Sequence, residues 1–382
     1  MPWDFVIAMP AVSLPRAVEA GNTAVVPFAD ARYQELIAAE AHVRKFLGSF
    51  CTAFGHQLQP AIVIRDRSAE RIQAEDLAAL RNMIALAAVT KARTDRCVHR
   101  FGGLGPVYAD LFELYPVNRA VDAETVTVRT ASEFGLDDDL EHFQGQPDPA
   151  YIYPQNVTVE LDEVLLRSLV ALWQSRRAGE DEDRFRRRVF RSLESAYHAL
   201  ASPFLNLGSQ YDHALRLALW VSAFEILTDR GDREGVERLI LAVTWSHPEL
   251  GLELVPSVRQ PPHDTHVPRP IQTCQRLYKV RNESLHGDAI SAHLVGHRLG
   301  GQEEDPIDTS RLCADEWNHL DVVVPALYRG VLLHLLTRER FHTYPEEPAD
   351  VEEYGDYFET RETYRHYEKP LLFQCRNRRH RR

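Results

Sequence analysis

The sequence predicts an α+β protein in which a mixed α/β domain is followed by an all-helical antiparallel bundle. Three observations support this fold class. Strand-like runs such as WDFVIAMPAV (residues 3–12) and AIVIRD (residues 61–66) fall in the first 161 residues. From residue 162 onward strand signals nearly vanish, and apolar residues recur at helical spacing. The 382-residue chain is 44% hydrophobic, so it is long and apolar enough to bury more than one core.

The N-terminal domain, expected over residues 1–161, alternates short strands with two helices. A Gly-rich stretch, FGGLGP, lacks the Lys-Ser/Thr pair of a phosphate loop, so we expect a turn there. The acidic stretch at 137–141 lacks the spacing of a calcium loop and is expected to be solvated surface. In chain order the expected elements are strands 3–12 and 23–28, helix 30–55, strand 61–66, helix 68–91, and strands 111–117, 124–134 and 151–161.

The second region, residues 162–345, is expected to be the bundle. Short breaks join most of its helices, which favours antiparallel neighbours. Residues 247–270 carry several prolines and histidines and are expected to form an irregular loop. Pro325 is expected to kink the last helix. The expected helices cover 163–174, 184–202, 211–231, 232–246, 271–286 and 311–341.

The C-terminal tail, residues 346–382, has two parts of opposite charge. Its first part, 346–362, is acidic with interleaved tyrosines, and its last seven residues are almost wholly basic. The basic cluster could hold RNA phosphates, fold back on the acidic part, or remain a disordered end. The basic residues considered for RNA are Arg376, Arg378 and Arg379.

The composition limits the classes of function. A net charge of −12 excludes a protein that coats nucleic acid indiscriminately, so a nucleic-acid site should be a local basic one. Five scattered cysteines without a CxxC pair predict neither disulfides nor a zinc knuckle. The histidines at 263, 266, 293 and 297 lack accompanying ligands, so no metal is expected. No basic leader and no run of about 20 apolar residues is seen, which predicts a soluble, cytoplasmic protein without a membrane partner.

The richest stretch for chemistry is QTCQRLYKVRNESLHGD, residues 272–288, which has the pattern of an amphipathic helix ending at Gly287. Asn282 and His286 are four apart and share a helix face. Arg281 is about 140° away from His286, an angle that a long guanidinium can bridge. A fixed cation, an amide and a titratable imidazole at one helix end could hold and cleave a phosphodiester.

Structural roles for the same residues remain open. Arg281 could pair with Glu283, and His286 could cap the carbonyls of the helix end. Glu225 is the single interior acid of an apolar helix. It could be the buried partner of Arg281, because an unpaired interior carboxylate is costly, or it could be exposed or take part in catalysis.

The residues Arg281-Asn282-Glu283-Ser284-Leu285-His286 resemble the signature of HEPN domains, in which an Arg is followed after four to six residues by a His. The preceding helix, ALRLALWVSAFEILTDRG, is similar to its counterpart in the ApeA-like HEPN group. The resemblance covers about residues 185–342. It implies a helical bundle that forms a homodimer with a composite active site. It also implies a metal-independent endoribonuclease without a cofactor, of the kind found in bacterial antiviral defence and toxin–antitoxin systems.

The resemblance also implies roles for individual residues. His286 would act as acid or base on the ribose 2′-hydroxyl or the leaving 5′-oxygen. Arg281 would hold the scissile phosphate, and Asn282 would orient His286 or the phosphate. Lys279 is a further candidate for contact with RNA. The N-terminal domain would sense a phage trigger, bind a regulatory protein or restrain the nuclease.

Two other classes of function are compatible with the sequence. One is a non-catalytic HEPN adaptor that dimerises and binds a nucleotide, RNA or a partner protein. The other is an unrelated helical regulator in which the motif is coincidental. The presence of Arg281, Asn282 and His286 together favours the nuclease.

Overall fold

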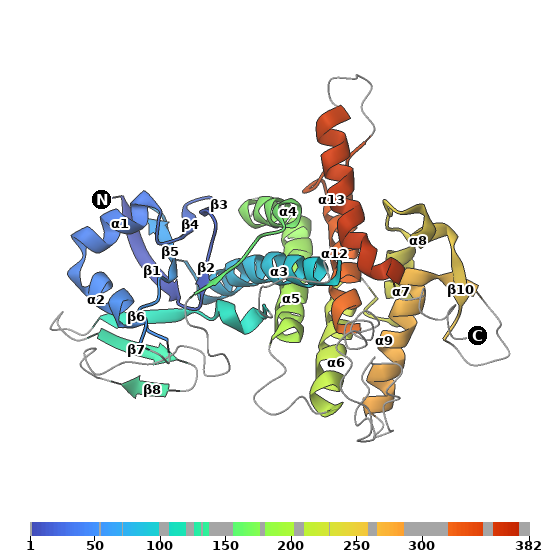
Figure 1. The fold of residues 1–382 in the computed structure, drawn as a ribbon, viewed down its shortest axis with the longest axis horizontal. Helices are drawn as coiled ribbons and strands as arrows, with labels where there is room; N and C mark the ends of the chain where they lie inside the picture. The colour runs from blue at the N-terminus through green and yellow to red at the C-terminus, as the bar shows by residue number, and fades with distance from the viewer. Residues whose placement is uncertain are drawn as a thin grey trace, which may run out of the picture.

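The fold is α+β, as the sequence predicts. The computed structural model describes residues 2–52, 55–70, 72–98, 107–119, 126–130, 133–136, 156–175, 180–201, 210–228, 230–258, 266–285, 320–346 and 354–373 of the chain. A β-sheet with two helices lies at one end of the molecule and a helical bundle at the other (Figure 1). A long helix, α3 (Ala74–Val98), extends from the sheet into the bundle.

The main sheet has seven strands in the order β3-β4-β5-β1-β6-β7-β8, and all neighbouring strands are antiparallel. A small parallel pair, β2 (Val12–Ser13) and β9 (Val157–Thr158), lies beside it. The seven strands are β1 (Trp3–Met9), β3 (Val18–Ala20), β4 (Thr23–Val26), β5 (Ala61–Asp66), β6 (Tyr115–Arg119), β7 (Val126–Thr130) and β8 (Glu133–Leu136).

The two faces of the sheet pack against different helices. Side chains alternate across a strand, so Ile62 and Ile64 of β5 face one side and Val63 faces the other. Ile62 and Ile64 join the core formed with α1 (Ala31–Ala39) and α2 (Ala41–Ser49). Val63 joins the larger core that contains α3 and the bundle. Strand β5 is therefore covered on both faces, and its second face connects the sheet to the bundle.

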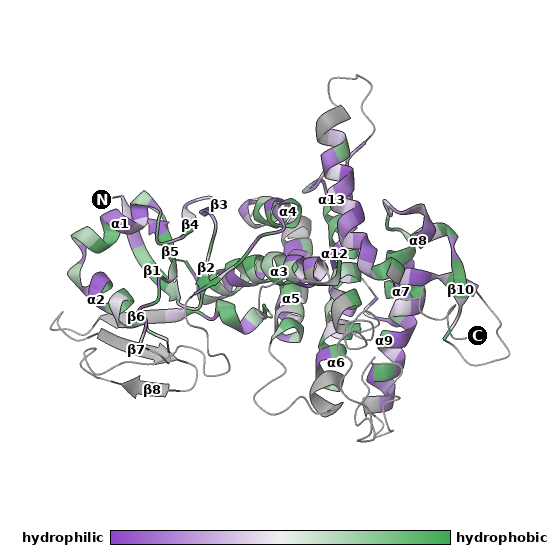
Figure 2. Cartoon of the chain, viewed as in Figure 1, coloured by the Kyte–Doolittle hydropathy of each residue, from purple (hydrophilic) through white to green (hydrophobic). Residues whose placement is uncertain are grey.

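The bundle surrounds the far part of α3. Helix α3 packs against α4, α5, α12 and α13, and α6 packs against α5, α9 and α12. Figure 2 shows hydrophobic and hydrophilic residues mixed along these helices, as expected for helices with one buried face. The bundle helices are α4 (Glu163–Gln174), α5 (Glu180–Leu200), α6 (Gln210–Leu227), α7 (Arg233–Leu241), α9 (Arg269–Leu285), α12 (Leu320–Arg338) and α13 (Tyr354–Phe373).

A buried ion pair and a backbone hydrogen bond meet at Asp162, the first residue of the expected bundle. Asp162 caps α4, because its carboxylate accepts a hydrogen bond from the Leu165 N–H at 3.1 Å. The same carboxylate pairs with Arg329 in the middle of α12, and both side chains are at most 2% exposed. The Asp162 N–H also donates to the Ala87 carbonyl of α3 at 3.1 Å. The division into two domains stays a prediction, and the packed core continues across it.

Several local expectations were wrong. The helix expected over 30–55 is two helices, α1 and α2, with extended backbone at Glu40 between them. The apolar spacing continues across this break, so periodicity could not reveal it. The strand expected over 124–134 is a hairpin of β7 and β8. The strand expected at 111–117 begins as a short 3-10 helix, Ala109–Phe112, before β6.

Two segments that were expected to be irregular or separate form regular structure. The expected loop 247–270 contains α8 (Pro248–Leu252) and the antiparallel pair β10 (Leu254–Pro256) and β11 (His266–Pro268). Side chains of α9 hold this pair: Gln272 donates to the Pro256 carbonyl at 2.7 Å. Residues 354–373, expected to belong to a tail, form α13 and pack on α3 and α12.

None of the helices in the described ranges is both long enough and apolar enough to span a membrane.

Candidate functional site

Helix α9 carries the Arg-Asn part of the motif and is held firmly by the bundle. Apolar residues at helical spacing bury one side of it against α6, α7 and α12. Polar side chains anchor its start: Arg269 donates to the Leu372 carbonyl at 2.6 Å and pairs with Glu253 at 2.6 Å. The buried apolar residues of α9 are Ile271, Cys274, Leu277, Tyr278 and Val280, all at most 4% exposed.

Exposure rises towards the end of α9. Arg281 is partly buried, and Asn282 is exposed. The Arg281 guanidinium donates a hydrogen bond from Nη1 to the Asn282 amide oxygen at 3.2 Å. Across the parts of the chain that the structure describes, no carboxylate pairs with Arg281. The arrangement presents a permanent cation, oriented by a neighbouring amide, near the end of a rigid helix.

Glu283, which could have neutralised Arg281, lies closer to another cation. Its carboxylate is 3.8 Å from the Lys279 ammonium, one helical turn earlier. This pairing keeps Lys279 partly occupied and leaves the Arg281 charge available to a ligand. The role of Lys279 in contacting RNA stays a prediction.

Glu225 has a different partner from the one expected. It lies on α6, and its carboxylate accepts a hydrogen bond from the Tyr278 hydroxyl at 3.0 Å. Burial, and then the charge of Glu225, raise the pKa of Tyr278 above its usual range. The expected Glu225–Arg281 ion pair is not among the contacts of the described residues. Tyr278 precedes Arg281 by three residues on α9, so the carboxylate meets the same helix about one turn earlier.

The remaining predicted site residues lie outside the described ranges. These are His286, which follows the last described residue of α9, and the basic residues Arg376, Arg378 and Arg379. The structure therefore brings together Arg281 and Asn282 of the motif. It places Glu225 beside the same helix, in contact with Tyr278.

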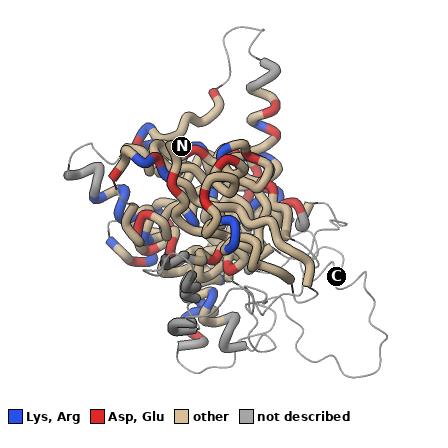
Figure 3. Tube along the Cα trace, turned by 90° about the vertical axis from the view of Figure 1, so that its left-hand side faces the viewer, with Lys and Arg blue, Asp and Glu red and all other residues tan. Residues whose placement is uncertain are grey.

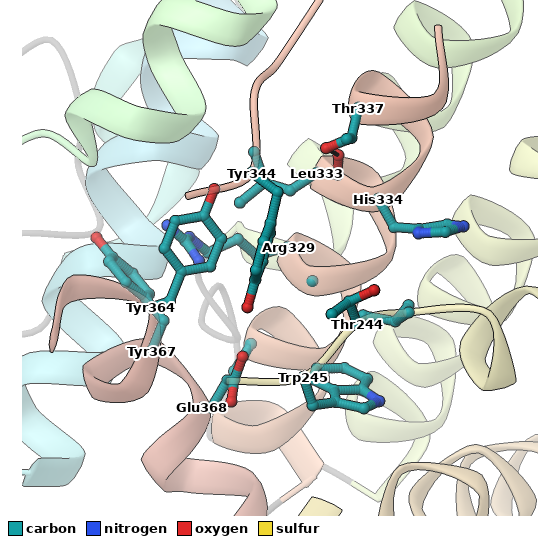
Figure 4. A pocket seen from close by; sticks show the side chains of 13 residues that line it. Thr244, Trp245, Arg329, Leu333, His334, Thr337, Tyr344, Tyr364, Tyr367 and Glu368 are labelled. Carbon is teal, nitrogen blue, oxygen red and sulfur yellow. Dashed lines mark hydrogen bonds between the residues drawn. The ribbon is translucent and has the colours of Figure 1, made fainter. Parts of the chain in front are cut away.

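A small pocket that sequence reasoning missed lies between α12, α13 and the segment after α7 (Figure 4). Its volume is about 50 Å³, space for a few water molecules. Arg329 reaches it from α12 and Glu368 from α13, with Tyr344 and Trp245 at its sides. The signal in the sequence was an arginine inside the apolar run DVVVPALYRGVLLHLL.

The charged groups of this pocket have partners within the protein. The Arg329 guanidinium stacks 3.7 Å from the centre of the Tyr367 ring and donates to Asp162. Burial works to lower the pKa of Arg329, but the charge of Asp162 raises it overall. Glu368 accepts hydrogen bonds from the N–H groups of Ser246 and His247 at 2.8 and 2.7 Å. These contacts link α12 and α13 to each other and to neighbouring segments. The pocket is also several times smaller than a typical ligand site.

Replacing Glu368 by glutamine is expected to change the pH dependence of stability. Burial outweighs the two hydrogen bonds and raises the pKa of Glu368 from 4.5 to about 7. A raised folded-state pKa adds stability below pH 4.5 that is lost as the pH rises through about 7. Relative to Glu368→Gln, the wild-type free energy of unfolding should fall by about 3 kcal/mol over this range.

Urea denaturation of both proteins between about pH 4.5 and 8 measures this difference. The comparison removes the contribution of His342, whose pKa is lowered to about 4, first by burial and then by Arg329. Parallel stability curves for the two proteins would show that Glu368 has an ordinary pKa.

The described residues contain no group of three or more His, Cys, Asp or Glu side chains placed to hold a metal ion. No family model, curated protein or solved structure matches this chain. A functional assignment therefore depends on the residues themselves, and the end of α9 is the place where their chemistry is most specific.

Proposed function

We propose that this chain is a HEPN-type, metal-independent endoribonuclease that acts in the cytoplasm as an antiviral defence or stress effector. The observation that carries the proposal is the Arg281–Asn282 pair near the end of α9, a helix whose described apolar residues are all buried. A cation that no described carboxylate neutralises, on a rigid support, suits a bound phosphate. The resemblance of 281–286 to the HEPN signature adds the histidine that the chemistry needs.

In the proposed reaction the RNA supplies its own nucleophile. The ribose 2′-oxygen attacks the adjacent phosphorus and its proton passes to a base, while the bond from phosphorus to the 5′-oxygen breaks and that oxygen receives a proton. The products are a 2′,3′-cyclic phosphate and a free 5′-hydroxyl. His286 transfers one of these protons, Arg281 stabilises the charge that develops on the phosphate, and Asn282 keeps the Arg281 guanidinium in place.

We further propose that two chains combine their motifs in a homodimer, each supplying half of a composite site. Lys279 and the C-terminal arginines would extend the contact with RNA, and the N-terminal half would respond to a phage trigger or regulatory protein. Mass measured in solution should then correspond to an even number of chains. A strict monomer, with and without RNA, would contradict the composite site.

The direct test is incubation of the purified protein with end-labelled RNA in EDTA, beside His286→Ala. We expect the wild type to cut the RNA and His286→Ala to be inactive. Equal cutting by both proteins would indicate a contaminating nuclease. Tight RNA binding without cutting, by a correctly folded wild type, would instead favour the alternative of a non-catalytic HEPN adaptor.

A further inference from the structure

A second concentration of positive charge lies away from α9, on α5 and at the end of α12. Four arginines of α5 lie at positions 184, 187, 188 and 191. The last three follow Arg184 by three, four and seven residues, so all four share one helix face. The opposite side of α5 is apolar and buried, including Phe185, Val189 and Leu193. Figure 3 shows how Lys and Arg (blue) and Asp and Glu (red) are distributed over the described part of the chain. We call these four residues and Arg338 the arginine cluster.

Packing holds the two parts of the arginine cluster together. The Phe185 ring stacks on Phe341, just after α12, with ring centres 6.3 Å apart and planes 6° apart. The Ser192 hydroxyl is hydrogen-bonded to the Tyr328 hydroxyl at 2.6 Å, and this buried contact also joins α5 to α12. The α5 face and the end of α12 are thus fixed beside each other by buried contacts.

Like charges crowd one another in this arrangement. Partial burial, and then the positive charges of Arg338 and Arg184, lower the pKa of the Arg188 guanidinium, with Glu339 opposing. Arg184 and Arg191 are exposed and make no ion pair with any described residue. Arg338 is 52% exposed and has one acidic neighbour, Glu339 at 3.0 Å. Crowded cations on a protein of net charge −12 cost stability, and a bound polyanion would offset that cost.

The geometry fits a strand of phosphates better than a single anion. Seven residues of helix span about 10 Å, which is longer than one phosphate group, so the cluster can contact more than one phosphate of a strand. Arginine is the residue best suited to bind phosphate oxygens with two parallel hydrogen bonds. We propose that the arginine cluster binds the phosphate backbone of a single-stranded RNA, independently of the end of α9. The choice of RNA rests on the proposed function, whereas the phosphate chemistry rests on the cluster itself.

Fluorescence anisotropy with a labelled single-stranded RNA of about 12 nucleotides tests the proposal. All proteins carry His286→Ala, so the probe stays intact and binding is read without cleavage. The test variant is Arg184→Gln with Arg191→Gln and Arg338→Gln. The control is Arg230→Gln with Arg238→Gln and Arg365→Gln, which removes three arginines whose side chains are 43–60% exposed and pair with glutamates elsewhere on the surface.

We expect the test variant to bind at least about 10-fold more weakly at low salt, with the slope of log K against log salt reduced by about 2. The control should bind within about 2-fold of the parent, and both variants should keep its melting temperature.

Equal weakening by the two variants would overturn the proposal, because net charge alone would explain it. Displacement of the RNA by millimolar inorganic phosphate, or by poly-glutamate at matched charge, would also overturn it. Binding by the cluster in a protein that cuts no RNA would leave this inference standing while the proposed function failed.

Discussion

An Asp162→Ala variant is expected to unfold with a free energy about 4 kcal/mol below that of the wild type. The substitution leaves the Arg329 guanidinium, 2% exposed, without its counter-charge, and breaking a buried pair in this way typically costs about 3–5 kcal/mol. It also removes the cap of α4, a loss of about 1 kcal/mol. Urea denaturation followed by circular dichroism measures the change, provided that the transition is two-state.

The neighbouring residue supplies a matched control. Glu163 pairs with Arg16 on the surface, where both side chains are more than a third exposed. Glu163→Ala should therefore change the free energy of unfolding by less than about 1 kcal/mol. Asp162→Asn keeps an oxygen that can accept from the Leu165 N–H but loses the charge, so it should fall between the wild type and Asp162→Ala. Similar losses for Asp162→Ala and Glu163→Ala would show that burial of the pair has little energetic weight.

Arg281→Ala is expected to lower the rate of RNA cleavage about 100- to 1,000-fold, the usual effect of removing one charge-stabilising donor from a transition state. Arg281→Lys keeps the charge but loses the planar fork, so an intermediate loss is expected. Single-turnover rates in EDTA with excess protein measure these effects. The loss should appear in the cleavage step more than in RNA binding, because the developing charge exists only in the transition state.

Arg238→Ala is the control for this experiment. It removes an exposed arginine from α7, where the side chain lies 3.5 Å from Glu234. Its cleavage rate should stay within about 2-fold of the wild type. An equal loss for Arg238→Ala and Arg281→Ala would mean that the charge of the protein as a whole, and not the position of Arg281, supports cleavage.

Local sequence patterns predicted the helices and strands whose buried residues show in their own apolar spacing. The apolar spacing of α4, α6 and α9 reflects one buried face each, and the strand β5 is continuous and apolar. Helix α13 was missed because its charged and tyrosine-rich sequence resembles a solvated tail. Its buried residues Tyr364 and Tyr367 are three apart, and they pack against Arg329, a residue more than 30 positions earlier.

The candidate site was predictable only in part, for a similar reason. The apolar spacing of one helix predicted that Arg281 and Asn282 lie near its end. The structure adds the hydrogen bond between them. The partner of Glu225 depends on how α6 meets α9, which spacing along either helix does not determine. The Asp162–Arg329 pair joins residues 167 positions apart, so no local pattern could indicate it.

The most direct measurement is cleavage, in EDTA, of two RNA oligonucleotides that differ by one atom. The first is all-ribose, and the second carries a 2′-deoxyribose on the 5′ side of the cut bond. We expect the wild type to cut the first, leaving a 2′,3′-cyclic phosphate, and not to cut the second at that bond. Cutting of the deoxy-substituted bond, or a strict requirement for a divalent metal ion, would contradict the proposed reaction.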